Sequence, residues 1–241
     1  MGEGRNAKAP AGRLQPNRSN PQKEDLAKDK ADARRLVAVS RETSGRLDRF
    51  AALLTEWQRK TNLVAPSTLP HLWTRHIADS AQLRRLAPDA KIWVDLGSGA
   101  GFPGIVIACM LAERPGPIVH LAESNAKKCA FLREAIRQIG LPAVVHCERI
   151  EQFAKEFADK ADVVTARALA PLDRLLPLAA LLLKSPAIGL FPKGQDVAAE
   201  LTAASKCWNI EATLEPSVTS SSSRILMVRK LELRKGATKR G

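Results

Sequence analysis

Residues 93–108 read WVDLGSGAGFPGIVIA, and this stretch decides the fold class. An apolar run ends near Asp95, three glycines follow at alternate positions, and a second apolar run begins after Pro103. The pattern is typical of a buried strand that passes through a glycine-rich loop into a helix. Such loops bring the main chain close to a nucleotide. The stretch therefore predicts a nucleotide-binding α/β sheet, and its details narrow the choice of ligand.

Two common phosphate-binding motifs fit this loop poorly. A P-loop ends in Gly-Lys followed by Ser or Thr, whereas no lysine lies between Lys91 and Lys127. The dinucleotide fingerprint Gly-x-Gly-x-x-Gly matches residues 99–104, but when it is counted from Gly97 its sixth position holds Phe102. A phenylalanine there would crowd a pyrophosphate at the start of the helix. The loop thus excludes a P-loop triphosphate site and disfavours a dinucleotide.

The residues beside the glycines favour a ligand without phosphate. Pro103 lacks an N–H group that would bind an anion, and it suits the first position of a helix. Asp95 at the strand end would repel phosphate but tolerate a cation. S-adenosylmethionine carries a sulfonium and an ammonium group and no phosphate. We therefore expect Gly97, Gly99 and Gly101 to bind this cofactor through close approach of the main chain.

Seven short apolar runs predict strands, and helical stretches separate most of them. The predicted strands cover residues 91–96, 117–123, 141–148, 161–169, 187–194, 208–216 and 222–232. The predicted helices cover residues 104–113, 126–140 with Gly140 as C-cap, 150–158, 171–183 with a kink at Pro177, and 196–207. This alternation predicts a Rossmann-like α/β fold, a mostly parallel sheet with helices on both faces. Residues 217–223, the Ser-rich loop, link the last two strands. We expect this pair to be antiparallel, because a short link permits a hairpin but no crossover.

The sequence divides into four parts. Residues 1–30 are polar and lack periodicity, which predicts a disordered basic tail. Residues 31–88 predict an N-terminal helical extension, with apolar side chains such as Leu47 at helical spacing and a second helix over its last twenty residues. Residues 89–232 hold the seven predicted strands, and residues 233–241 form a basic C-terminal tail.

The charge of the chain points to a polyanionic partner. The formal net charge is +13, and the two ends carry most of it, with +4 in residues 1–35 and +5 in residues 229–241. Basic ends suit nucleic acid, although plain solubility would also account for them. No apolar run reaches the roughly 18 residues that span a bilayer, and the N-terminus lacks the apolar stretch of a secretion signal. The four cysteines form no Cys-x-x-Cys pair. We expect a cytoplasmic protein with buried free thiols and no metal.

Several motifs in order resemble one bacterial family. They are DLGSGAGFPGIVIA, LAESNAKKCAFLREA, ERIEQF, TARALAPL and FPKG, preceded by LLTEWQRKTNLVAPS and RHIADSAQL. Over residues 40–230 the chain resembles the small-subunit ribosomal RNA methyltransferase G family, formerly called the glucose-inhibited division protein B family. The resemblance implies a seven-stranded methyltransferase sheet with S-adenosylmethionine as methyl donor. It also implies the product, 7-methylguanine in 16S ribosomal RNA near the decoding centre.

The resemblance also implies which residues contact the cofactor. The family contacts fall on Gly97, Phe102, the Ile150–Glu151 pair and Arg167. Ile150 would lie against the adenine ring while Glu151 and the main chain bind its exocyclic amine. Many family members carry Ser before the arginine, where this chain has Ala166, which offers no hydroxyl.

An acid at the end of the second predicted strand completes the predicted cofactor site. Glu123 is placed to accept hydrogen bonds from ribose hydroxyls, although dinucleotide enzymes share such an acid and an exposed strand-end carboxylate would look the same.

The implied reaction needs no general base. N7 of guanine carries a free lone pair, so no proton has to leave before it attacks the sulfonium methyl. The sequence agrees, since we find no cysteine nucleophile motif, no metal-ligand cluster and no Asn-Pro-Pro-[Tyr/Phe] motif after the fourth strand. Catalysis would come from positioning and electrostatics. We assign the catalytic role to Arg167, and we expect Arg167→Ala to abolish methylation and leave the fold intact.

Four side chains near predicted strand ends are candidates for binding 16S ribosomal RNA or a 30S particle. They are Arg75, His76, Arg174 and Lys193. Arg75 and His76 could equally belong to a helix-surface network that caps the cofactor pocket.

Other ring side chains are predicted to have structural roles. We expect His71 and His146 to have no role in chemistry, and we expect Trp57 and Trp73 to pack the N-terminal helices on the sheet.

Two other classes of function compete with this interpretation. An NAD(P)-dependent oxidoreductase could use the same sheet, but its Tyr-x-x-x-Lys catalytic pair is excluded because the chain contains no tyrosine. A methyltransferase-fold RNA-binding or ribosome-assembly factor without essential catalysis is the second alternative. The glycine loop, Glu123 and Arg167 argue against it.

Overall fold

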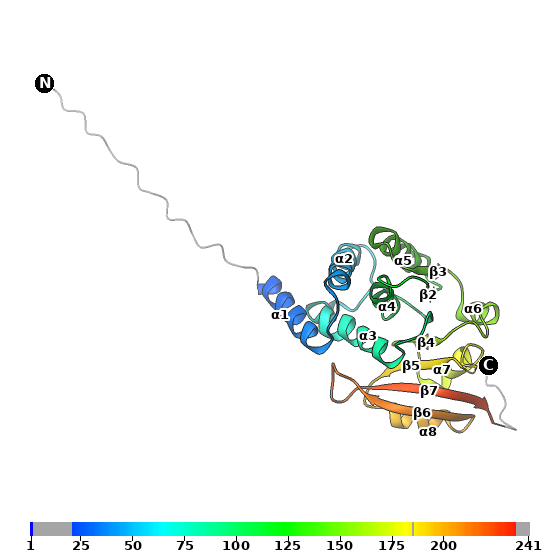
Figure 1. Ribbon diagram of the computed structural model, residues 1–241. Helices are drawn as coiled ribbons and strands as arrows, with labels where there is room; N and C mark the ends of the chain where they lie inside the picture. The colour runs from blue at the N-terminus through cyan, green and yellow to red at the C-terminus, as the bar shows by residue number, and fades with distance from the viewer. Residues whose placement is uncertain (2–20, 185, 235–241) are drawn as a thin grey trace.

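The computed structural model describes Met1, residues 21–184 and residues 186–234, and it is built around one seven-stranded sheet (Figure 1). The strands are β1 Ile92–Leu96, β2 Ile118–Ala122, β3 Ala143–His146, β4 Val163–Thr165, β5 Ile188–Lys193, β6 Trp208–Pro216 and β7 Arg224–Leu233. All seven predicted strands are confirmed. The fourth is much shorter than residues 161–169, because only three residues pair with both neighbouring strands.

The strand order is β3-β2-β1-β4-β5-β7-β6. β1 to β5 are parallel, whereas β7 is antiparallel to both β5 and β6. The predicted antiparallel final hairpin is therefore confirmed. The order reverses between β1 and β4, and in sheets of this kind ligands bind at the carboxyl ends of the strands beside such a reversal. The hairpin brings the Ser-rich loop to that same edge, since Arg224 of β7 pairs with Lys193 at the end of β5.

Helices cover both faces of the sheet and give it two apolar layers (Figure 1). α4 Gly104–Leu111 and α5 Ala126–Ile139 lie on one face, with α2 Arg41–Gln58 packed outside them. α6 Ile150–Glu156, α7 Leu172–Ala179 and α8 Val197–Ala204 cover the other. Gly140 is confirmed as the C-cap of α5, in the left-handed region at φ 72°. α7 ends at Ala179 and does not continue to residue 183, since the chain beyond it forms turns instead.

The N-terminal extension is helical, but its second half is irregular. Its elements after α2 are the 3-10 helix η1 Pro66–His71, the π-helix η2 Trp73–Ala78, α3 Asp79–Ala81 and the 3-10 helix η3 Gln82–Leu86. The sequence predicts a helical stretch from residue 69 that ends before Pro88. The stretch is helical, but it divides into short 3-10, π and α segments. Pro70 lies inside η1, where its ring and missing N–H disfavour regular α-helix.

The predicted N-terminal tail is shorter than residues 1–30. Helix α1 spans Pro21–Leu36, so the last third of that range is helical. The rest of the range after Met1 lies outside the described residues, as do residues 235–241 of the predicted C-terminal tail. Asp29 of α1 is buried and accepts hydrogen bonds from the main-chain N–H groups of Trp73 and Thr74. A buried carboxylate fixes this helix in place, and composition alone does not reveal its partners.

Both tryptophans have structural roles, although Trp57 packs on helix α5 and not on the sheet itself. Trp73 is buried in the main apolar cluster, and the ring of Trp57 lies 5.7 Å from that of Phe131 on α5.

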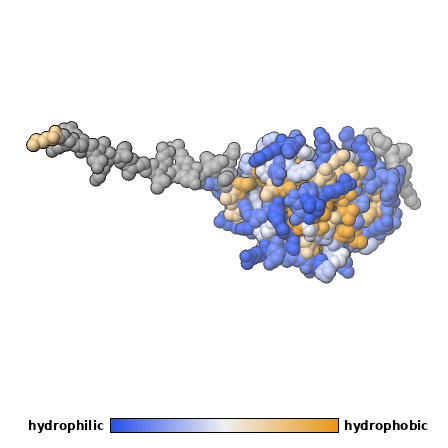
Figure 2. Space-filling model, turned by 90° about the horizontal axis from the view of Figure 1, so that it is seen from above, coloured by the Kyte–Doolittle hydropathy of each residue, from blue (hydrophilic) through white to orange (hydrophobic). Residues whose placement is uncertain are grey.

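The surface of the face shown in Figure 2 is mostly hydrophilic, with hydrophobic residues gathered in the middle of it. Within the described residues, no helix combines the length and the apolar character that crossing a bilayer requires. All four cysteines are free, as predicted, but only Cys109 and Cys129 are buried. The expectation of burial is wrong for Cys147, which is exposed, and for Cys207, which is half-buried.

Candidate active site

The glycine loop between β1 and α4 adopts backbone conformations that side chains disfavour. Gly97, Gly99 and Gly101 have φ values of 66°, 56° and 89°. Left-handed φ is costly for residues with a Cβ atom, which explains glycine at alternate positions. A Cβ on Gly101 would lie 2.5 Å from Ile105, whereas one on Gly99 would meet only the carbonyl oxygen of Gly97, at 3.7 Å. The main chain is therefore open to a ligand at Gly99.

Asp95, at the end of β1, stabilises the end of the glycine loop through hydrogen bonds. Its side chain is 1% exposed, and it accepts hydrogen bonds from the N–H of Gly104 at 3.1 Å and from the hydroxyl of Thr165 at 2.8 Å. Burial raises the pKa of Asp95 to about 6, and these hydrogen bonds limit the rise. Both oxygens bind the start of α4 and the neighbouring strand, so Asp95 supports the loop and does not offer a free oxygen to a ligand. Pro103 precedes the helix as its N-cap residue, one position before the place that the sequence predicts.

Glu123 ties the glycine loop to the end of β2. Its Oε2 accepts from the N–H of Gly99 at 2.9 Å, and its Oε1 accepts from the N–H of Asn125 at 2.8 Å. The residue is 8% exposed. A carboxylate offers about four acceptor sites, so two remain after these bonds. Glu123 therefore both shapes the loop and keeps acceptors for a ligand hydroxyl.

The Ile150–Glu151 pair lies one strand further along the same edge. It begins α6, just after β3, and β3 pairs in parallel with β2, which ends beside Glu123. Ile150 is half-buried and Glu151 is exposed. This placement lets an apolar side chain and a carboxylate meet a ligand that extends from the glycine loop across the end of β2.

The ring of Phe102 is enclosed. It is 4% exposed, and it packs edge-on against Phe50 and stacks on His76, with ring centroids 5.3 and 5.0 Å away. The guanidinium carbon of Arg167 lies 5.1 Å from its centroid. Because these side chains surround the ring, Phe102 would contact a cofactor through its main chain.

Arg167 joins the sheet to the N-terminal extension. Its Nη1 donates to the main-chain oxygen of Arg75 at 3.2 Å and lies 3.6 Å from Oδ2 of Asp79, and its Nη2 lies 2.7 Å from Nδ1 of His76. Since arginine only donates, Nδ1 of His76 accepts, and Nε2–H donates to Thr68 at 2.9 Å. Burial and the charge of Arg167 lower the pKa of His76 to about 3, which keeps the ring neutral. Of the two roles open for His76, the structural network is the one that these contacts support.

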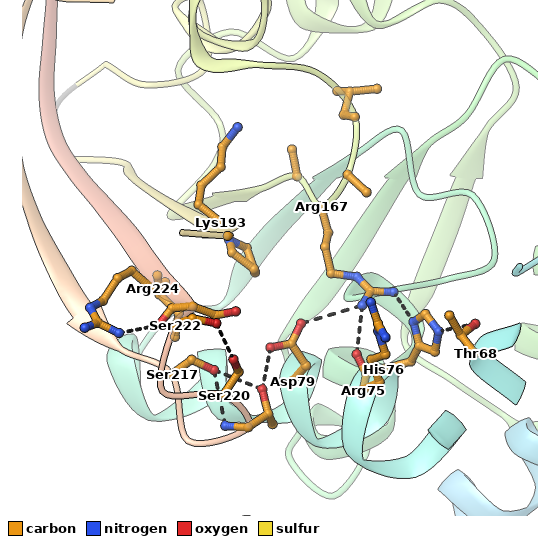
Figure 3. A pocket seen from close by; sticks show the side chains of 18 of the residues that line it. Thr68, Arg75, His76, Asp79, Arg167, Lys193, Ser217, Ser220, Ser222 and Arg224 are labelled. Atoms are coloured by element: carbon orange, nitrogen blue, oxygen red, sulfur yellow. Dashed lines mark hydrogen bonds and ion pairs between the residues drawn. The ribbon is translucent and has the colours of Figure 1, made fainter. Parts of the chain in front are cut away.

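A cavity of about 1030 Å³ opens at the carboxyl ends of β4 and β5 (Figure 3). Five segments line it: residues 68–79 of the N-terminal extension, the residues from the end of β4 into α7, the end of β5, Glu200 of α8, and the Ser-rich loop with the start of β7. Its charged lining residues are Arg75, Asp79, Arg167, Lys193, Glu200 and Arg224. The cavity adjoins the glycine loop through Leu169, a lining residue whose Cδ1 lies 2.6 Å from where a Cβ on Gly97 would stand.

The predicted RNA-binding side chains differ in their availability. Arg75 is exposed and lines the cavity. Lys193 also lines it, but this side chain is only 10% exposed and is paired with Glu200 at 2.8 Å. Arg174 is exposed on α7 and is not among the lining residues. The structure thus brings Arg75, His76 and Lys193 to one cavity and leaves Arg174 outside it.

Sequence reasoning missed three charged residues of the cavity: Asp79, Glu200 and Arg224. A signal existed for Arg224, because an antiparallel last strand must begin beside the end of β5, where Lys193 lies. No local signal marks Asp79 or Glu200.

Sequence reasoning also missed a partner of His146. Nε2 of His146 lies 3.0 Å from Nδ1 of His120 across β2 and β3. The pair packs on Phe153 and Phe157, away from the cavity. In the part of the chain that the structure describes, no group of three or more His, Cys, Asp or Glu is placed to hold a metal ion.

Solved structures share this fold at low sequence identity. An O-methyltransferase from Bacillus cereus, in complex with SAH, superposes with a TM-score of 0.57 at 12% identity, covering 85% of this chain and 100% of that one. A methyltransferase from Geobacter sulfurreducens gives a TM-score of 0.53 at 14% identity, covering 75% of this chain and 88% of that one. These similarities establish the methyltransferase sheet.

Sequence relatives are much closer. A protein named ribosomal RNA small subunit methyltransferase G from Bradyrhizobium sp. (strain ORS 278) is 57% identical over 221 residues, which are 92% of this chain and 100% of the relative. A protein of the same name from Rhodopseudomonas palustris (strain BisB18) is 54% identical over 212 residues, 88% of this chain and 91% of the relative. The family model for rRNA small subunit methyltransferase G matches residues 44–228. The chain therefore belongs to the rRNA small subunit methyltransferase G family.

Proposed function

We propose that this protein transfers a methyl group from S-adenosylmethionine to N7 of a guanine in 16S ribosomal RNA, near the decoding centre. One observation carries the proposal most directly. Leu169 lies between the glycine loop and the large cavity, so a cofactor on the loop and a base in the cavity would be neighbours. Family membership supplies the reaction class.

The residues around the glycine loop fit S-adenosylmethionine. The open main chain at Gly99 accommodates close approach, and Glu123 has acceptors left for the ribose hydroxyls. Ile150 and Glu151 are placed for the adenine, one strand further along. When bound, this cofactor supplies an electrophilic methyl group on sulfur. None of these residues has to move a proton, since each one binds or orients.

The cavity suits a nucleotide extruded from RNA. Its volume of about 1030 Å³ is at the upper end of ordinary ligand sites, which leaves room for a base with part of its backbone. Arg75 and Arg224 offer positive charge to phosphate, and the serines of the Ser-rich loop offer hydroxyls to ribose or phosphate. This mixture of cations and hydroxyls favours RNA over an apolar small molecule.

The state of His76 agrees with a reaction that needs no base. Its Nδ1 accepts from Arg167 and its Nε2–H donates to Thr68, so neither nitrogen is free to take a proton. N7 of neutral guanine needs none, because its lone pair attacks directly. The chain's contribution is then the alignment of N7 with the methyl group, within a fixed polar cavity. Arg167 lies at the cavity wall and is our proposed contact to the reacting groups.

The test measures methyl transfer and RNA modification together. Purified protein is incubated with radiolabelled S-adenosylmethionine and either naked 16S RNA or 30S particles from a strain that lacks the gene. We expect label in 7-methylguanine, and we expect mass analysis of 16S RNA from the deletion strain to show that base unmodified. Unchanged 7-methylguanine in that strain would overturn the proposal. It would favour the RNA-binding or assembly factor instead.

Calorimetric titration separates the cofactor alternatives. We expect S-adenosylmethionine to bind and NAD not to bind, because Pro103 has no N–H group and the N–H of Gly104 is taken by Asp95, so the start of α4 offers a pyrophosphate few donors. A cytoplasmic location follows from the proposed substrate and stays a prediction.

A further inference from the structure

The Ser-rich loop does not stand free at the edge of the sheet, because the N-terminal extension holds it. The N–H of Val218 donates to Oε1 of Gln82 at 2.9 Å, and Nε2 of Gln82 donates to Oγ of Ser217 at 3.1 Å. The hydroxyl of Thr219 donates to Oδ1 of Asp79 at 3.0 Å. Three consecutive loop residues are thus bound to two residues that lie more than 130 positions earlier.

The buried amide of Gln82 needs the loop to satisfy its own hydrogen bonds. It is 1% exposed, and its amide nitrogen also donates to Oδ1 of Asp79 at 2.9 Å and to the main-chain oxygen of Asp79 at 3.1 Å. A buried amide is costly unless it is hydrogen-bonded. Without Val218, the oxygen of Gln82 would lose its bond, so the fold favours the loop in this one position.

Asp79 extends the connection to Arg167. Its Oδ1 accepts from Gln82 and Thr219, while its Oδ2 faces Nη1 of Arg167 at 3.6 Å. Figure 3 shows Asp79 between the loop on one side and Arg167 on the other. Polar contacts therefore run without a break from Val218 through Gln82 and Asp79 to Arg167.

The loop in turn supplies one wall of the cavity. Ser220, Ser222, Ser223 and Arg224 line it, and Nη1 of Arg224 donates to the main-chain oxygens of Ser221 and Ser223 at 2.7 and 2.8 Å. Arg224 is therefore held beside the serine hydroxyls. Cations and hydroxyls on one wall suit the sugar–phosphate backbone of RNA more than the face of a base.

We propose that Gln82 and Asp79 are positioning residues for the RNA substrate, which fix the Ser-rich loop as the wall that binds the sugar–phosphate backbone beside the target guanine. The inference rests on the proposed function, because it takes the cavity to be the RNA site. It assigns the loop to RNA affinity and not to cofactor affinity, since neither Gln82 nor Val218 touches the glycine loop or Glu123 in the contacts described above.

The experiment removes the hydrogen bonds that hold the Ser-rich loop, first by a substitution in the N-terminal extension and then by one in the loop. Gln82→Met keeps the length of the side chain and removes its hydrogen bonds. Thr219→Val removes one hydroxyl from the loop itself, outside the core, and Thr219→Ser restores it. Thr213→Val on exposed β6 is the matched control. Each variant is assayed for its KM toward two substrates, naked 16S RNA and assembled 30S particles. The Kd of S-adenosylmethionine and the hydrogen exchange of residues 217–223 are measured on the same preparations.

We expect Gln82→Met to raise the KM for RNA by roughly 10-fold or more, because it removes both bonds from Gln82 to the loop. We expect Thr219→Val to raise it by roughly 3- to 10-fold, because it removes the one bond from Thr219 to Asp79. Exchange in residues 217–223 should be faster in both. The Kd of S-adenosylmethionine should stay within about 2-fold of the wild type. Thr219→Ser and Thr213→Val should behave as the wild type.

Three results would overturn the inference. They are faster exchange with an unchanged KM for RNA, unchanged exchange in both variants, and a loss of cofactor affinity equal to the loss of RNA affinity. The wild-type arm reports on the proposed function separately. A wild type that transfers no methyl group to RNA refutes that function, whereas an active wild type with unaffected variants refutes only the role of Gln82 and Asp79.

Discussion

Nη2 of Arg167 lies 2.7 Å from Nδ1 of His76, and this hydrogen bond joins the segment after β4 to the π-helix of the N-terminal extension. His76 stacks in turn on Phe102 of the glycine loop. The extension, the glycine loop and the cavity thus meet at one side-chain contact. A change at Arg167 should therefore affect stability as well as catalysis.

Replacing Arg167 by alanine tests both effects. We expect methyl transfer to be lost and the free energy of unfolding to fall by roughly 2–4 kcal/mol, because Asp79 would remain buried without its cation. The sequence alone predicts that the fold of this variant stays intact. The structure adds that the fold becomes less stable. Urea unfolding and a methyl-transfer assay give the two numbers.

Arg167→Lys is the matched control, since it keeps the charge but not the planar fork that serves Arg75, His76 and Asp79 together. We expect it to recover part of the stability and little of the activity. Near wild-type activity in the alanine variant would remove Arg167 from the site.

Glu123→Gln tests the cofactor site. One carboxylate oxygen becomes an amide nitrogen that faces the N–H of Gly99 or of Asn125, so one loop bond is lost and two donors oppose each other. We expect the Kd of S-adenosylmethionine to rise by roughly 10-fold or more, measured by calorimetry. Glu134→Gln is the control, because Glu134 is paired with Arg137 on its own helix. Equal effects of the two substitutions would contradict the assignment.

Gly101→Ala tests the geometry of the glycine loop. The Cβ would lie 2.5 Å from Ile105 and the backbone would stay at φ 89°, so we expect a loss of roughly 2–4 kcal/mol of stability. Gly116→Ala has a similar φ of 98° with nothing within 4 Å of the new Cβ, and it should cost only about 1 kcal/mol. The difference between the two variants in thermal unfolding isolates the steric contact. Equal losses would show that the contact with Ile105 relaxes freely.

The lowered pKa of His76 predicts a pH dependence of stability. The folded pKa of about 3 lies below the ordinary 6.5, so between these values the unfolded chain binds a proton that the folded chain does not. The stability that depends on neutral His76 is complete above pH 6.5 and is lost as the pH falls toward 3. Asp95 has the opposite sign, because its pKa is raised from 3.8 to about 6 and its contribution falls as the pH rises through that window.

His76→Asn separates the two groups. Its Oδ1 can replace Nδ1 as acceptor for Arg167 while it has no titrating ring, and Asp95 is present in both proteins and cancels. We expect the wild type to lose more stability than the variant between about pH 7.5 and about pH 5 in urea unfolding. Parallel curves would mean that His76 titrates normally in the folded protein.

Two deletions test the basic N-terminus. Residues 1–20 hold four Lys/Arg and one Glu, and their removal should weaken RNA binding, reduce its salt dependence and spare cofactor binding. Removal of residues 1–30, which the sequence alone suggests, also takes away Asp29, the buried acceptor for Trp73 and Thr74. We expect only the longer deletion to lower the melting temperature. An unchanged salt slope in the shorter deletion would exclude the tail from RNA binding.

The sheet could be predicted from the sequence because its signals are local. Apolar runs, glycine turns and a C-cap such as Gly140 each act within a few residues. The irregular course of residues 66–86 could not be predicted, because helical periodicity does not distinguish α from 3-10 or π geometry. The short β4 shows the same limit, since pairing with both neighbours decides where a strand ends.

The candidate site was predicted only in part, because the sequence does not show which side chains already have partners. Asp95 and Lys193 look free in the sequence, but each one is satisfied by a partner from a different part of the chain, Thr165 and Glu200. Gln82 carries no sequence signal, since its loop partners lie more than 130 residues away. Residue types indicate what a side chain can do, and only the fold shows which side chains are already engaged.

The late position of β7 in the chain governs when the RNA cavity can be completed during synthesis. Thr68 and Arg75 leave the ribosome early, but the opposite wall of the cavity is incomplete until Arg224, which lies much later in the chain, has also emerged. A nascent or prematurely terminated chain can carry the whole glycine loop without a finished RNA cavity. Such a fragment could hold the methyl donor and would have no wall against which to place a guanine.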